Sequence, residues 1–173
     1  MASTILIFLL SLLISASADS NFIQKTCKLT KHYDLCLSSL KSNPTSANVD
    51  AKGLALIMIG VGTANATATS TYLSSQSLSS ASNDTVLKRV LKECAEKYSF
   101  AGDALQDSAQ YLASENYDYV AVDVTAAADY PNACHNAFKR FPGLVYPPEI
   151  ARRERGLKEI CDVILGILEH IAW

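Results

Sequence analysis

The sequence predicts an all-α protein: an up-down-up-down four-helix bundle preceded by a disulfide-closed α-hairpin. Glycine is scarce, at 7 of 173 residues, and no segment alternates apolar and polar residues over a strand's length. Four long segments instead repeat apolar residues at three- and four-residue spacing. Helices of about 35–45 Å joined by short loops fit a bundle in which each helix has two neighbours.

The first 20 residues are predicted to be a leader. Their apolar run, Ile5–Ile14, is shorter than the roughly 20 residues of a membrane span. The small residues Ala16–Ala18 are typical of a signal-peptide cleavage site. We therefore expect a signal peptide at 1–18, a mature domain at 19–173 and no membrane anchor. Because the secretory pathway is oxidising, cysteines of the mature domain are expected to pair.

Cys27 and Cys36 are 9 positions apart, just after the leader. In one unbroken helix their Cα atoms would be about 13.5 Å apart, whereas a disulfide needs roughly 4.4–6.8 Å. A bridge between them therefore requires a reversal, predicted near Thr30–His32, within an α-hairpin over residues 21–42. Zinc is disfavoured because the spacing matches no common zinc pattern.

The bundle is expected over residues 50–172, after a polar connection at Lys41–Asn48. Its first helix is predicted from an N-cap at Asp50 to about Ser77, and the serine-rich residues 74–83 are expected to end it as a loop. The apolar residues that it is predicted to turn inward are Leu54, Ile57, Met58, Val61, Ala68 and Tyr72.

The second helix is predicted to begin near Asn83 or Asp84. Its inward residues are Leu87, Val90, Leu91, Cys94, Tyr98, Ala101, Leu105 and Leu112. The third begins near Asn116, and Pro131 predicts a kink or break about one turn before that proline. Its inward residues are Tyr117, Val120, Val124, Ala127, Cys134 and Phe138.

The last helix is predicted over Glu149–Ile171, after a turn-rich connection at residues 141–148. Its inward residues are Ile150, Leu157, Ile160, Cys161, Ile164, Leu168 and Ile171. Cys94 and Cys134 point inward from consecutive antiparallel helices, so a second bridge between them is plausible. Other pairings remain open, because five cysteines can pair in several ways. We expect Cys161 to be the unpaired cysteine, buried and inert.

The composition contains little that predicts chemistry. A net charge of −2 disfavours nucleic acid as a partner. The three histidines, His32, His135 and His170, lie in different predicted elements, and no HExxH, GxSxG, P-loop or GxGxxG motif is present. We therefore expect a binding protein without catalytic, cofactor or metal sites. Two glycosylation sequons occur, at Asn65 and Asn83, and Asn83 is the better acceptor because Asn65 falls on a predicted core stripe.

The sequence resembles the plant invertase and pectin methylesterase inhibitor family over nearly all of the mature chain. The matching segments are TCKLTKHYDLCLSSLKSNP, KGLALIMIGVG, VLKECAEKY and YPNACHNAF. DTVLKRVLKEC and EIARRERGLKEIC bring it nearest to the cell wall/vacuolar inhibitors of β-fructosidase, in the invertase-inhibitor branch. The resemblance implies Cys27–Cys36 and Cys94–Cys134 disulfides and a free Cys161.

The same resemblance implies a function. The protein would inhibit plant acid invertase by blocking its active-site cleft against sucrose, in the cell wall (apoplast) or the vacuole. Inhibitors of this type can carry Pro-Lys-Phe at the start of the third bundle helix, where it enters the cleft. The aligned residues here are Tyr117-Asp118-Tyr119, so Asp118 replaces a cation, and the contact would need an acidic pH that leaves one of two facing carboxylates protonated. The target contact is expected from Glu115, Asn116, Tyr117, Asp118 and Tyr119.

The sequence leaves three alternative functions. A pectin methylesterase inhibitor would use the same bundle against a different enzyme, through a helix face. A helical carrier would hold a small apolar ligand inside the bundle, but the closely spaced large side chains favour a filled core. A non-inhibitory storage protein is the third.

Overall fold

The computed structural model describes residues 21–79 and 85–172, and this part of the chain is helical with no strand. Residues 21–27 are helical and lead into the first labelled elements. The elements are α2 (Tyr33–Ser42), η1 (Pro44–Asn48), α3 (Ala51–Ser79), α4 (Thr85–Ala113), α5 (Tyr117–Lys139) and α6 (Pro148–Leu168). The predicted signal peptide at 1–18 and the sequon residue Asn83 lie outside the described residues.

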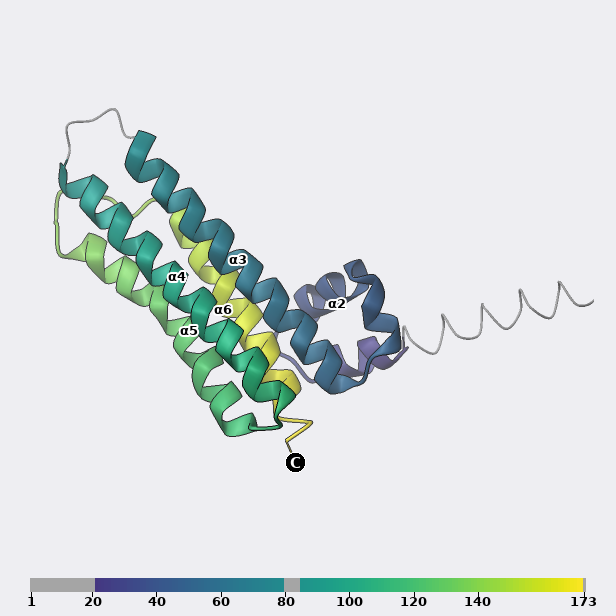
Figure 1. Cartoon of the computed structure of the whole chain (residues 1–173). Helices are drawn as coiled ribbons and strands as arrows, with labels where there is room; N and C mark the ends of the chain where they lie inside the picture. The colour runs from purple at the N-terminus through teal and green to yellow at the C-terminus, as the bar shows by residue number, and fades with distance from the viewer. Residues whose placement is uncertain (1–20, 80–84, 173) are drawn as a thin grey trace, which may run out of the picture.

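The four long helices form the predicted up-down-up-down bundle. Each of α3, α4, α5 and α6 contacts two of the others, in the cyclic order α3, α4, α5, α6 (Figure 1). Short connections join α4 to α5 and α5 to α6, so successive helices run antiparallel. The N-terminal hairpin lies against the outside of α3 and α6 rather than inside the bundle. The predicted fold class is confirmed.

The core contains most of the predicted inward residues of α4, α5 and α6. They are buried at three- and four-residue spacing, as an amphipathic helix requires. Those with at most 5% exposure are Val90, Leu91, Cys94, Tyr98, Ala101, Leu105, Leu112, Val120, Val124, Ala127, Cys134, Phe138, Ile150, Leu157, Ile160, Cys161, Ile164 and Leu168.

The stripe of α3 agrees only in part with the prediction, because Ala68 is exposed and several residues that were not predicted are buried. Leu54 and Met58 are buried as predicted, and a second row of buried positions alternates in steps of four and three: Ala55, Ile59, Gly62, Ala66, Thr69 and Leu73. A Cβ at Gly62 would lie 3.0 Å from Leu105 Cδ1, so α3 packs very close to α4 here. Small side chains allow this close approach. The prediction relied on large apolar residues and therefore did not identify it.

Helix α3 is also long and apolar enough to cross a membrane, with a mean hydropathy of 1.2 over an 18-residue window. Its packing against α4 and α6 accounts for that composition, because a core helix needs the same apolar residues.

The ends of two helices and the course of α5 differ from the sequence prediction. Helix α3 continues to Ser79 through residues expected to form a loop, and the Ser77 hydroxyl donates to the Lys88 carbonyl of α4 at 3.1 Å. Of the kink or break predicted before Pro131, the break is absent, because α5 continues through this buried proline. A proline removes one backbone donor, but packing with neighbouring helices stabilises the surrounding turns. Helix α6 ends at Leu168, three residues earlier than predicted, and turns follow it.

Both disulfides have the pairing that the family resemblance implies. Cys27 and Cys36 close the hairpin with a Cα–Cα distance of 5.5 Å. Cys94 of α4 and Cys134 of α5 are bonded at a Cα–Cα distance of 4.6 Å, which ties two neighbouring bundle helices together. Cys161 is the free cysteine among the described residues, and it is buried. Burial raises the pKa of its thiol to about 12, so the reactive thiolate is scarce at neutral pH.

The hairpin reverses at residues 28–32, where the turn was predicted, and this turn docks on α6. The His32 Nε2 atom lies 3.2 Å from Asp162 Oδ2. A Cβ built at Gly166 of α6 would lie 3.1 Å from Thr30 Cα, so the hairpin backbone almost touches α6. The hairpin is therefore attached to the bundle by close packing as well as by its polar contacts.

Candidate functional site

The predicted contact residues lie in the tight connection between α4 and α5. The Glu115 N–H donates to the Leu112 carbonyl at 3.2 Å, and the Asn116 N–H donates to the Tyr111 carbonyl at 2.9 Å. This pair of bonds is the Schellman motif, which closes the end of a helix by satisfying its last carbonyls. The chain then enters α5 at Tyr117. The connection is thus a defined turn, and it determines how the start of α5 is presented.

Glu115 has an unusual backbone conformation for its residue type. Its φ is +60°, and no other non-glycine residue in the described ranges has a positive φ. The Schellman motif requires this left-handed conformation at the position that Glu115 occupies, where glycine is the usual residue. For an L-residue the conformation costs about 1–2 kcal/mol. A strained residue is therefore located at the tip of the predicted contact.

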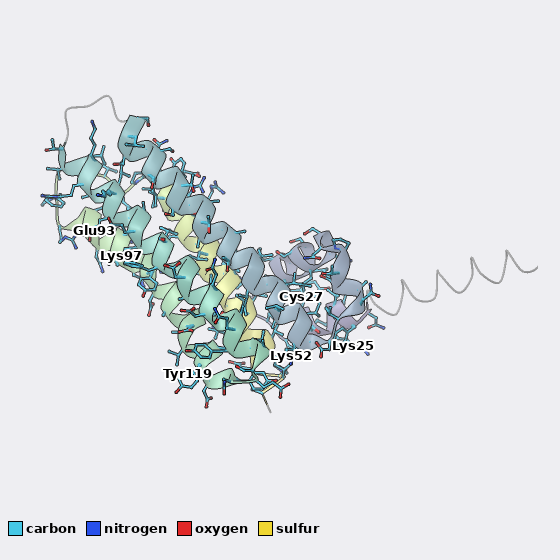
Figure 2. The ribbon with its side chains drawn as sticks, viewed as in Figure 1. Lys25, Cys27, Lys52, Glu93, Lys97 and Tyr119 are labelled. Carbon is cyan, nitrogen blue, oxygen red and sulfur yellow. A yellow bond between two sulfur atoms is a disulfide. The ribbon has the colours of Figure 1, made fainter. Side chains whose placement is uncertain are left out.

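The side chain of Glu115 reaches the start of α3. Its Oε1 atom accepts a hydrogen bond from Lys52 Nζ at 3.0 Å. Both side chains are exposed to solvent, at 66% for Glu115 and 37% for Lys52. The hydrogen bond to Glu115 raises the pKa of Lys52 above its ordinary value. Figure 2 shows Lys52 at the same end of the bundle as Tyr119.

The start of α5 has no side-chain cap. Asn116 occupies the N-cap position, but its side chain makes no cap hydrogen bond, and its Nδ2 atom donates to Ser114 Oγ at 3.0 Å instead. The first N–H groups of a helix have no partner inside the helix, and they carry the positive end of the helix dipole. Asp118, in the first turn, is exposed. The start of α5 therefore combines unbonded backbone N–H donors with the acidic side chain of Asp118.

The two tyrosines of the predicted contact have different environments. Tyr117 is half-buried and packs against the core, whereas Tyr119 is 61% exposed. The Tyr119 ring stacks on Tyr111 of α4, with ring centroids 5.1 Å apart and an interplanar angle of 25°. A shallow hollow beside it is lined by residues 115–119 and Ala172. The most exposed ring of the segment is therefore held against α4 rather than projecting freely.

Tyr111 and Lys52 were not among the residues predicted from the sequence. For Tyr111 a usable signal existed: Tyr111 and Tyr119 are each 4 positions from Glu115. Residues equally distant from the turn of an αα-hairpin lie opposite each other. The same symmetry places Asp107 opposite Asp123, and Phe100 opposite Tyr130, whose ring centroids are 5.8 Å apart. No comparable signal links Lys52 to Glu115, because they are separated by the whole length of two helices.

Asp123 of α5 lies opposite Asp107 of α4, in the seam where these two helices pack together. Its Oδ2 atom is buried and has no hydrogen-bond partner. Burial raises the pKa of Asp123 above the ordinary value of 3.8, and the charge of Asp107 raises it further. Burial and the nearby Asp107 charge therefore favour the protonated form of Asp123 in the folded protein.

A polar cluster at the other end of the bundle has the residue types of an acid–base site. The Glu154 carboxylate accepts from Tyr146 Oη at 2.9 Å and from Lys158 Nζ at 3.0 Å. His135 lies 3.8 Å from the same carboxylate and stacks on Tyr146. Glu154 is only 12% exposed, and burial together with its hydrogen bond raises the pKa of Tyr146. The cluster holds the connection between α5 and α6 onto the bundle and leaves no open carboxylate for a substrate.

The described residues contain no group of three or more His, Cys, Asp or Glu side chains that could hold a metal ion. The three histidines lie on α5, beside α2 and after α6. Asn65 of the first sequon is half-buried, and its Nδ2 atom is 4.0 Å from where a Cβ of Gly156 would lie. Glycans attach to this Nδ2 atom, and here it faces α6. This position is consistent with the expectation that Asn65 is a poor glycan acceptor.

Comparisons with known proteins identify the relatives of this chain. The model of the family described as plant invertase/pectin methylesterase inhibitor matches residues 21–167. The "Cell wall / vacuolar inhibitor of fructosidase 2" of Arabidopsis thaliana is 49% identical and aligns over 99% of both chains. The "Pectinesterase inhibitor" of Actinidia deliciosa is 32% identical over 88% of this chain and 80% of its own.

Solved structures agree with these relatives. A crystal structure of a mutant form of a pectin methylesterase inhibitor from Arabidopsis superimposes with a TM-score of 0.64. It is 26% identical, and the match covers 83% of this chain and 92% of that one.

Proposed function

Because the chain belongs to the plant invertase/pectin methylesterase inhibitor family, we propose that it inhibits a plant acid invertase by binding over the active-site cleft and excluding sucrose. The family and the relatives named above are inhibitors and not enzymes. The observation that carries the choice of target is the match to the fructosidase inhibitor. It has higher identity, and it spans a larger share of both chains, than the match to the pectinesterase inhibitor of Actinidia.

The proposed contact surface is the start of α5, residues 115–119. Its support is the exposure of Tyr119, the uncapped N–H groups and the fixed direction of the preceding turn. Aromatic side chains at such a position are frequent interface anchors, and helix starts favour acidic partners. The acid–base carboxylates of a glycosidase are acidic groups of this kind.

Asp118 gives the proposed contact a pH dependence. It would face the carboxylates of the enzyme, and two facing carboxylates are held together most easily when they share a proton. The complex should therefore weaken as pH rises from about 4.5 to 7, when the shared proton is lost. An Asp118→Asn variant should show a flatter dependence, because an amide needs no proton to approach a carboxylate. An unchanged pH profile in this variant would remove Asp118 from the contact.

The proposed location follows from the leader and the relatives. Residues 1–18 would be cleaved as a signal peptide, and the mature protein at residues 19–173 would be delivered to the cell wall or the vacuole. Asn83 is the proposed glycosylation site.

The deciding experiment titrates the oxidised, mature protein against an acid invertase and a pectin methylesterase in parallel. It is done at about pH 5, where facing carboxylates can share a proton. We expect loss of invertase activity at inhibitor concentrations that leave the methylesterase unaffected. Inhibition of the methylesterase alone would establish the alternative, a pectin methylesterase inhibitor, and would overturn the proposal.

A further inference from the structure

Glu115 combines two features that stability alone does not explain. It occupies a left-handed backbone position that glycine would adopt without strain. An exposed ion pair such as Lys52–Glu115 contributes little to stability, because water and salt screen it. The ion pair is therefore too weak to offset the backbone strain, and a turn with glycine at position 115 would be at least as stable. What a glycine cannot supply is the carboxylate that reaches α3.

The ion pair joins the turn to a firmly anchored part of the molecule. Lys52 lies in the first turn of α3, where the Asp50 side chain accepts from the Gly53 N–H at 2.8 Å and caps the helix. The next turn of α3 carries Leu54, Ala55 and Met58, each fully buried. A side chain bound to Lys52 is thus held relative to the bundle core. The α4–α5 turn itself carries Asn116 and Asp118, both exposed, and its own packing is limited to the half-buried Tyr117 and the stack of Tyr119 on Tyr111.

We propose that Lys52 and Glu115 are positioning residues, whose ion pair fixes the direction in which the start of α5 presents Tyr119 and its free N–H groups to the target enzyme. This inference rests on the proposed function, since it names what holds the proposed contact surface in place. The physical gain is preorganisation: a contact segment held in one orientation loses less conformational entropy on binding. Neither residue needs to touch the enzyme for this effect.

Four variants test the proposal through inhibition constants and thermal midpoints. Glu115→Gly relaxes the backbone but removes the carboxylate, so it should melt no lower than the parent and yet inhibit at least 5-fold less well. Lys52→Met should weaken inhibition by a similar factor. The exchanged pair, Lys52→Glu with Glu115→Lys, restores an ion pair of opposite polarity and should recover most of the inhibition. Lys41→Met, at an exposed lysine on α2, removes the same charge and should inhibit like the parent.

Amide hydrogen exchange provides a readout that does not depend on the target. Exchange at residues 120–123, whose amides are the first in α5 to have a carbonyl partner inside the helix, should be faster in Lys52→Met than in the parent and in Lys41→Met. It should slow again in the exchanged pair. Unchanged exchange in Lys52→Met would overturn the positioning role, even if the protein inhibits no invertase at all.

The inhibition data separate the two proposals. If Tyr119→Ala weakens inhibition while Lys52→Met and Glu115→Gly do not, the contact surface is correct and the positioning role is wrong. If the exchanged pair does not recover inhibition, Glu115 acts by touching the enzyme directly, and the positioning role is again wrong. If Tyr119→Ala has no effect on an active inhibitor, the contact surface itself is misplaced.

Discussion

Tyr119 of α5 stacks on Tyr111 of α4, with 5.1 Å between ring centroids, at the end of the bundle where the chain turns from one helix into the other. The two rings form a single exposed aromatic surface, because Tyr119 is 61% and Tyr111 36% exposed. A cleft that accepts Tyr119 must therefore accommodate Tyr111 as well, or displace it.

Removing the Tyr119 ring should weaken inhibition. We expect Tyr119→Ala to lose at least about 1 kcal/mol of binding free energy, the usual threshold for a meaningful interface residue. Tyr111→Ala should lose less, because it removes the support of Tyr119 and not the ring itself. Inhibition constants against acid invertase measure both. Phe100→Ala is the matched control, since it removes another ring contact from the same seam, the one with Tyr130, far from the turn. Equal losses in Phe100→Ala and Tyr119→Ala would show that the effect comes from stability and not from contact.

Asp123 should make the free protein less stable at neutral pH than at mildly acidic pH. Its pKa is raised in the folded protein, first by burial and then by Asp107, so the folded state holds the proton more tightly than the unfolded chain. The folded state binds more protons between the ordinary pKa of 3.8 and the raised value, and stability therefore falls as pH rises through that window. Above it, the loss remains constant.

The Asp123→Asn variant tests this assignment by urea denaturation between about pH 4 and pH 7. The variant should gain stability over the parent as pH rises, because an amide has no charge to desolvate. Asp103→Asn, which removes an exposed carboxylate of α4, should follow the pH profile of the parent. If the free energies of unfolding of Asp123→Asn and the parent change with pH in the same way, the buried oxygen is not the cause of the pH dependence.

Loss of the bundle disulfide should be costly. Cys94→Ser opens the bridge to Cys134 and should lower the free energy of unfolding by about 2–5 kcal/mol, the usual effect of losing a native disulfide. Cys161→Ala should leave both bridges intact, and the parent thiol should resist alkylation until the protein unfolds, because it is buried and its pKa is about 12. Peptide mapping under non-reducing conditions checks the pairing. A peptide joining Cys161 to Cys94 or Cys134 would contradict it.

Two glycines within helices should respond oppositely to alanine. Gly60 of α3 has no atom within 4 Å of a built Cβ, so Gly60→Ala should stabilise by about 0.5–1 kcal/mol, the ordinary gain inside a helix. In Gly166→Ala the new Cβ would lie 3.1 Å from Thr30 Cα, so the gain should be cancelled or reversed. We expect amide exchange in residues 21–40 to be faster than in the central turns of the long helices, and Gly166→Ala should make it faster still. Equal gains in stability in the two variants would mean that the hairpin moves away from α6 without loss of stability.

Local pattern was sufficient for the helices whose buried side chains are large. In α4, α5 and α6 the apolar stripe is marked by leucine, valine, isoleucine and aromatic residues, and it could be predicted because burial follows directly from helical spacing. In α3 half of the buried residues are alanine, glycine or threonine, and Ala68 was assigned inward although it is exposed. Small residues are compatible with either side of a helix, so which of them are buried depends on how closely the neighbouring helix approaches.

The sequence by itself determined the all-α class, the four long helices, the reversal between Cys27 and Cys36, and the residues at the start of α5. Each of these follows from periodicity, from spacing or from an alignable motif within one segment. Only the tertiary structure decided that α5 continues through Pro131, that Tyr119 rests on Tyr111, and that Glu115 is bound to Lys52. These outcomes depend on contacts between residues of different helices. Such contacts form only when packing of the core brings the helices together, so no local sequence pattern predicts them.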